Sequence, residues 1–73
     1  MDEQGLKELM ILRDEEFKKL HEEHRNQEEK LKIYEAKAHL SEAETIEERE
    51  IKKKKLALKD RMCRMMAEYR KSL

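Results

Sequence analysis

AHLSEAE, residues 38–44, separates two long helical patterns and decides the fold. Ser41 followed three residues later by Glu44 is a capping box, in which the Ser41 hydroxyl accepts a hydrogen bond from the Glu44 backbone N–H and the Glu44 carboxylate accepts one from the Ser41 N–H. Acidic residues follow Ser41 closely, where they stabilise the positive end of a helix dipole. We therefore predict a link over residues 38–41 and a second helix over about residues 42–71.

The residues before the link repeat with the spacing of a coiled-coil seam. Alternating steps of four and three from Leu6 to Ala38 reach mostly apolar side chains. A disordered polar segment would not keep this periodicity over several heptads, so the pattern favours a helix. We therefore predict a first helix over about residues 5–38. Arg13 is a misfit in this seam, and Asp14 is able to cap a fresh helix start after a short opening helix, so residues 13–14 are a candidate position for a kink in this first helix.

The second helix carries a matching seam. A link this short makes the two helices antiparallel neighbours, and with equal rise on both helices the numbers of facing residues sum to about 81. The predicted fold is all-α, an antiparallel two-helix hairpin that resembles a coiled coil. Its seam comprises Leu6, Met10, Phe17, Leu20, His24, Gln27, Leu31, Tyr34, Ile51, Lys55, Leu58, Met62, Met65 and Tyr69.

The composition supports long helices in a single small domain over residues 1–73. Charged residues make up 49% of the chain, with one Gly and no Pro, which is typical of long helices or coiled coils. Residues 1–48 hold 8 basic and 15 acidic side chains, a balance of −7, and residues 49–73 hold 10 basic and 3 acidic, a balance of +7. Opposite charge on the two halves favours their lying side by side.

The chain has no feature of a secreted or membrane protein. Its single cysteine, Cys63, excludes an internal disulfide and fits a reducing compartment. The N-terminus MDEQGLKELMIL has no sustained apolar run or cleavage site, and no stretch is long and apolar enough to span a membrane. We therefore expect a cytoplasmic location and no membrane partner.

Two segments resemble a known family. DEEFKKLHEEHRNQEEKL, the short link HLS and IKKKKLALKDRM together resemble the YdcH-like proteins, which are short bacterial chains of uncharacterised function. Phe17, Leu20 and His24, with Leu31 one heptad later, and the segment Lys55–Asp60 carry the resemblance. It implies a self-associating helical hairpin and assigns no catalytic residue.

His21 and His24 are the first candidates for chemistry. Zinc needs three or four well-placed ligands, and the pair has i, i+3 spacing instead of the i, i+4 spacing of metalloprotease helices. Lysines on the second helix face His24 and repel a divalent cation. We therefore predict no metal site and interpret His24 and Gln27 opposite Lys55 as a polar layer in the seam. Our hypothesis is that this layer selects the register of the hairpin or its dimer partner.

A basic tract, Lys52–Lys55, suggests an alternative function. The leading hypothesis is a small structural or protein-interaction module that self-associates through the heptad seam and an apolar open end. A basic helix can also bind phosphates without specificity, so the alternative hypothesis is a nucleic-acid-associated protein that uses the basic second helix. Four consecutive helical residues do not form one stripe, however, and acidic side chains of the first helix lie alongside. No catalytic set, phosphate loop or substrate pocket can be assigned, so we predict neither enzymatic activity nor a cofactor.

One hairpin buries only one stripe of each helix, and further apolar residues gather near its open end. We predict that this surface faces a partner. We expect a homo-oligomer, with a dimer that forms a four-helix bundle as the leading arrangement, and an unidentified protein as a possible further partner. The predicted partner face comprises Leu9, Ile11, Leu12, Leu56, Met66 and Leu73.

Overall fold

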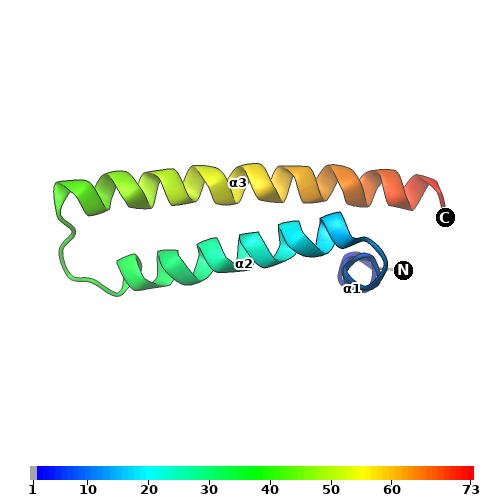
Figure 1. The fold of residues 1–73 in the computed structure, drawn as a ribbon, viewed down its shortest axis with the longest axis horizontal. Coiled ribbons are helices and arrows are strands. Elements are labelled where there is room, and N and C mark those ends of the chain that lie inside the picture. The colour runs from blue at the N-terminus through cyan, green and yellow to red at the C-terminus, as the bar shows by residue number, and fades with distance from the viewer. Residues whose placement is uncertain (1) are drawn as a thin grey trace.

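The computed structural model describes residues 2–73, and Met1, the first residue of the predicted domain, lies outside them. Three helices follow in chain order, α1 (Glu3–Arg13), α2 (Glu15–Glu35) and α3 (Glu42–Lys71), and the described residues contain no strand. α2 and α3 lie side by side and antiparallel, and α1 lies across their open end (Figure 1). The predicted all-α class is confirmed, but the chain forms three helices where two were predicted.

The expected kink at residues 13–14 is a complete break. Asp14 has extended backbone angles, φ −122° and ψ 109°, and it belongs to two caps at once. Its N–H donates to the Met10 carbonyl at 2.8 Å at the end of α1, and its carboxylate accepts from the Phe17 N–H at 3.1 Å at the start of α2. The prediction of one helix over residues 5–38 was therefore wrong.

The antiparallel register explains why the chain turns at this point. In one continuous helix Leu6 would lie level with about position 75, beyond the end of α3 at Lys71. The first turns would then have no partner helix to pack against. By crossing the open end instead, α1 buries Leu6 and Met10, each only 1% exposed. The apolar area removed from water favours the break.

The core of the molecule is therefore built by three helices at the open end. Phe17 is fully buried at 0% exposure, and Ile11, Met65 and Tyr69 are partly buried against the cluster that surrounds it. This cluster consists of Leu6 and Met10 from α1, Phe17 and Leu20 from α2, and Leu58, Met62 and Met66 from α3. Leu6 and Met10 thus belong to a crossing helix and do not extend the seam of α2.

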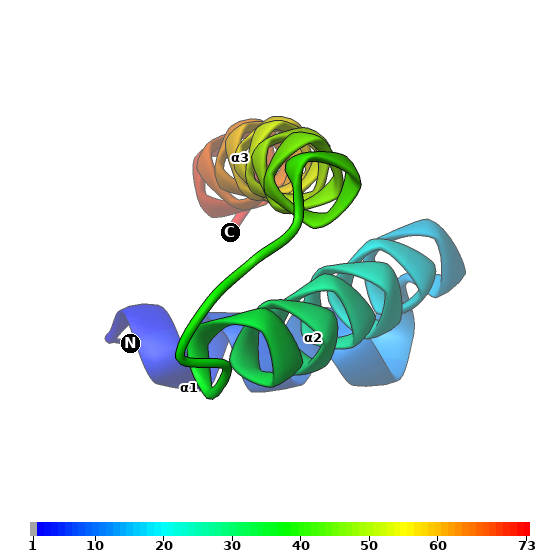
Figure 2. The same cartoon turned by 90° about the vertical axis from the view of Figure 1, so that its left-hand side faces the viewer.

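At the other end of the molecule, residues 36–41 carry the chain from α2 to α3. α2 ends at Glu35 instead of the predicted residue 38, with the Lys37 N–H donating to the Tyr34 carbonyl at 3.1 Å. The link is longer than predicted because the chain crosses the gap between the two helix axes before α3 begins (Figure 2). Ser41 and Glu44 then form both halves of a capping box, at 3.1 and 3.2 Å.

Candidate protein-interaction groove

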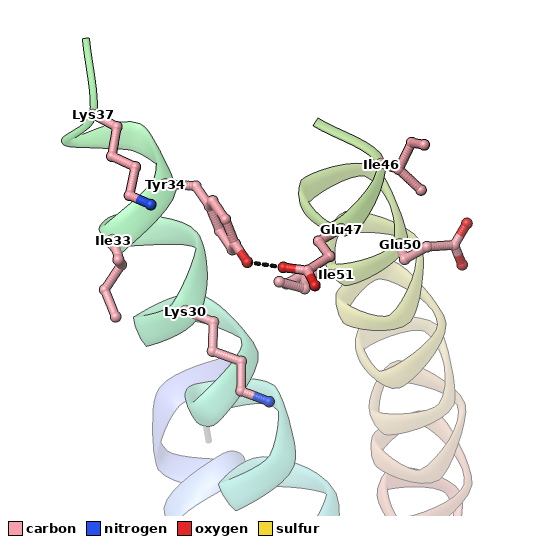
Figure 3. A pocket seen from close by; sticks show the side chains of 8 residues that line it. All are labelled: Lys30, Ile33, Tyr34, Lys37, Ile46, Glu47, Glu50 and Ile51. Carbon is pink, nitrogen blue, oxygen red and sulfur yellow. Dashed lines mark hydrogen bonds between the residues drawn. The ribbon is translucent and has the colours of Figure 1, made fainter. Parts of the chain in front are cut away.

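An apolar groove lies at the link end of the hairpin. A shallow groove of about 570 Å³ runs between α2 and α3, and we name it the link-end groove. Its lining residues are Lys30, Ile33, Tyr34, Lys37, Ile46, Glu47, Glu50 and Ile51 (Figure 3). Ile33 and Ile46 keep 63% and 60% of their surface exposed, so this end of the hairpin presents branched apolar side chains to solvent.

Two polar contacts join the helices at this groove. The Tyr34 hydroxyl reaches from α2 and donates a hydrogen bond to the Glu47 carboxylate on α3 (Figure 3). The Lys37 ammonium forms an ion pair with Glu44 and also lies 5.6 Å from the centroid of the Tyr34 ring, within cation–π range. Both contacts follow the predicted register, and together they hold the ends of α2 and α3 at a defined separation.

These contacts change the acidity of the groups that make them. The hydrogen bond to Glu47 raises the pKa of the Tyr34 hydroxyl above its usual value, because the neighbouring carboxylate disfavours a phenolate. The hydrogen bond from Lys37, aided by the Ser41 backbone N–H, lowers the pKa of the Glu44 carboxyl. Tyr34 is therefore a neutral donor and Glu44 an ionised acceptor at neutral pH.

The two walls of the link-end groove carry opposite charge. Lys30 and Lys37 belong to the α2 side, and Glu47 and Glu50 belong to the α3 side. A helical element that also has one basic side and one acidic side can pack on this apolar surface with opposite charges facing each other. The side chains that line the groove are isoleucine, lysine, glutamate and one tyrosine, and they include no His, Cys, Ser or Thr.

His21 and His24 do not line this groove, and His24 belongs to the polar layer of the seam. His24 is half-buried, and its Nδ1 is 3.8 Å from a Glu28 carboxylate oxygen. Lys55 approaches the same oxygen at 3.6 Å, which adds Glu28 to the layer predicted from His24, Gln27 and Lys55. Gln27 is buried at 6% exposure. Sequence reasoning placed Glu28 alongside the lysine tract but did not assign it to the layer, because it lies one position outside the strict heptad seam.

Burial controls the protonation of His24. Nε2 of His24 and Nδ1 of His21 are buried and have no hydrogen-bond partner among residues 2–73. Desolvation lowers the pKa of His24 below its usual value, and the positive charges of Lys55 and Lys7 act in the same direction, while Glu28 opposes them. Within the described residues, no three His, Cys, Asp or Glu side chains gather in a way that could hold a metal ion.

Most of the basic tract on α3 is paired with carboxylates. Lys52 lies 3.2 Å from Glu48 and Lys53 lies 4.0 Å from Glu50, both on α3 itself. Lys55 contacts Glu28, and further along α3 Arg61 pairs with Glu16, so α2 supplies the partners of these two. The tract is therefore a mixed-charge surface whose positive potential is reduced by its neighbours.

All the predicted seam residues are buried or half-buried, but the predicted partner face divides into two groups. Leu12, Leu56 and Leu73 are 84%, 60% and 70% exposed. Met66, in contrast, is buried in the core, and Ile11 packs against that core. Assigning Met66 and Ile11 to an open partner surface was wrong, because α1 folds across the open end. Leu9, also on α1, is half-buried.

Sequence reasoning missed the exposed isoleucines of the link-end groove. Ile33 precedes the seam residue Tyr34, and Ile46 lies five residues before the seam residue Ile51, so both fall outside the heptad steps. The signal in the sequence was that both isoleucines flank the link, where no third helix was predicted to pack. Apolar residues that flank a link on both sides remain uncovered unless another element packs there.

Comparison of the chain with protein-family models, with curated proteins and with solved structures finds no match in any of the three. The resemblance to the YdcH-like proteins therefore stays a prediction, and it assigns no role to any residue. None of the helices in residues 2–73 has the length and apolar content that crossing a membrane requires.

Proposed function

We propose that this chain is a small structural or protein-interaction module, without enzymatic activity, that associates with a second copy of itself through the link-end groove. The groove between α2 and α3 at the link end supports this proposal. At the open end α1 covers the core but leaves Leu12 and Leu73 exposed as single side chains, whereas at the link end Ile33 and Ile46 stay more than half exposed and line one groove together. Packing two such grooves together would bury these side chains and produce a four-helix bundle.

The charge distribution makes this function preferable to nucleic-acid binding. Lys52, Lys53 and Lys55 each have a carboxylate within 4.0 Å, so a phosphate backbone would compete with acidic groups that are already in place. A steep fall of the binding constant for random duplex DNA with increasing salt would instead support the nucleic-acid hypothesis. We expect no saturable DNA binding at physiological salt.

Sedimentation equilibrium tests the proposed self-association with two matched substitutions. Ile46 and Leu56 lie on α3 and are both 60% exposed, but only Ile46 lines the link-end groove. We expect Ile46→Glu to convert a concentration-dependent dimer into a monomer and Leu56→Glu to leave the dimer intact. A wild-type chain that stays monomeric up to high micromolar concentration contradicts the proposal. Dissociation by Leu56→Glu alone would move the interface to the face predicted from the sequence.

A further inference from the structure

Two charged side chains of the link-end groove have no close ion-pair partner within one chain. Lys37 pairs with Glu44, and Glu47 accepts the Tyr34 hydrogen bond. Lys30 has no carboxylate within 4.0 Å among residues 2–73, and Glu50 has only the Lys53 contact at the limit of 4.0 Å. Lys30 and Glu50 line the same groove from opposite walls, with Lys30 on α2 and Glu50 on α3 (Figure 3). One unpaired positive charge on α2 and one weakly paired negative charge on α3 are therefore exposed at this groove.

A second copy can pack its own groove against this one about either of two two-fold axes. If the axis runs across the helices, α2 packs on α2 and α3 packs on α3, and both grooves bring like charges together. If the axis runs along the helices, α2 of each copy packs on α3 of the other, and basic walls meet acidic walls. Juxtaposed like charges oppose association, so the charge pattern favours the second arrangement.

The register of the hairpin decides which residues meet in that arrangement. Rotation about an axis parallel to the helices leaves every residue at its own level along the bundle. Facing residues within one hairpin have numbers that sum to about 81, so Lys30 lies level with Glu50. In the dimer Lys30 is therefore level with Glu50 of the second copy, and Ile33 is close to the level of Ile46 of the second copy. A two-fold interface repeats each contact, which gives two such charge pairs.

We propose that two copies of this chain pair through the link-end groove about a two-fold axis parallel to the helices, with reciprocal Lys30–Glu50 pairs that determine which helices meet. This inference rests on the self-association proposed above and adds its orientation. Both links then lie at the same end of the bundle. The groove receives no side chain from α1, so α1 stays outside the interface.

Charge reversal at Lys30 and Glu50 tests the arrangement. Lys and Glu have similar helix propensities, so the substitutions preserve the helices. We expect Lys30→Glu alone and Glu50→Lys alone each to weaken the dimer by about tenfold, since two attractive contacts become repulsive. We expect the double variant K30E/E50K to recover the wild-type dissociation constant. Lys32→Glu, an exposed position outside the groove, is the matched control and leaves the constant unchanged.

A mixing experiment separates the two possible axes. In the proposed arrangement wild type and K30E/E50K bring like charges together, so the mixture sorts into two homodimers. With the axis across the helices the same mixture gains attraction, and heterodimers dominate. Native mass spectrometry, with a short affinity tag on one of the two proteins, counts the species. Heterodimer formation, or failure of K30E/E50K to recover affinity, overturns the arrangement while the self-association stands. A monomeric wild type overturns both proposals.

Discussion

Leu6 and Leu12 lie on the same short helix and have opposite environments, so shortening each side chain tests the docking of α1. Leu6 is 1% exposed in the core, and Leu12 is 84% exposed. Leu→Ala in a packed core lowers the free energy of unfolding by about 2–5 kcal/mol through lost burial and a residual cavity. The same change at an exposed position stays within about 0.5 kcal/mol.

The expected difference in free energy of unfolding between the two variants is large for a chain of this size. Marginal stability of roughly 0.05–0.15 kcal/mol per residue corresponds to roughly 4–11 kcal/mol for this chain. Leu6→Ala therefore removes a substantial part of the total, and a loss of 2 kcal/mol lowers the melting temperature by about 8 °C or more. Leu12→Ala is the matched control, because the change in intrinsic helix propensity is the same at both positions.

Urea unfolding followed by far-ultraviolet circular dichroism measures both variants. Protein concentration is held constant, because self-association adds to the apparent stability. We expect the unfolding midpoint to fall for Leu6→Ala and to stay near the wild-type value for Leu12→Ala. Equal midpoints for the two variants would refute the docked position of α1. They would indicate a first helix that frays or continues straight past the end of α3.

Two further predictions concern the helix break and the polar layer. Asp14→Ala removes the side-chain cap at the start of α2 and lowers the free energy of unfolding by about 0.5–2 kcal/mol. Asp14→Asn keeps a capping oxygen and stays close to wild type in the same urea assay. Equal losses of unfolding free energy in the two variants would mean that the cap contributes nothing. Burial lowers the folded-state pKa of His24 from 6.5, so the unfolded chain binds the proton first as the pH falls. The free energy of unfolding therefore declines as the pH falls through 6.5, and this loss is complete below the folded-state pKa. His24→Leu should flatten this part of the pH profile of melting temperature and raise stability at its acid end, and an unchanged profile would show that His24 does not titrate in this range.

The sequence alone determined that α2 and α3 are helical and that their seam residues turn inward. The Ser41–Glu44 capping box, the apolar spacing around Phe17 and the absence of Pro act between residues a few positions apart, so they can be identified without knowing the fold. The same local rules identified Asp14 as a residue able to cap a new helix. They also predicted the register in which Tyr34 meets Glu47.

Only the tertiary structure decided whether the chain turns at Asp14 and which apolar side chains remain exposed. The direction of α1 depends on a comparison between two distant environments for Leu6 and Met10, one beyond the end of α3 and one inside the core. Local patterns contain no information about that comparison, because burial is gained against residues more than forty positions away. Once α1 packs across the open end, Met66 becomes core, and the isoleucines beside the link remain exposed in the groove between α2 and α3.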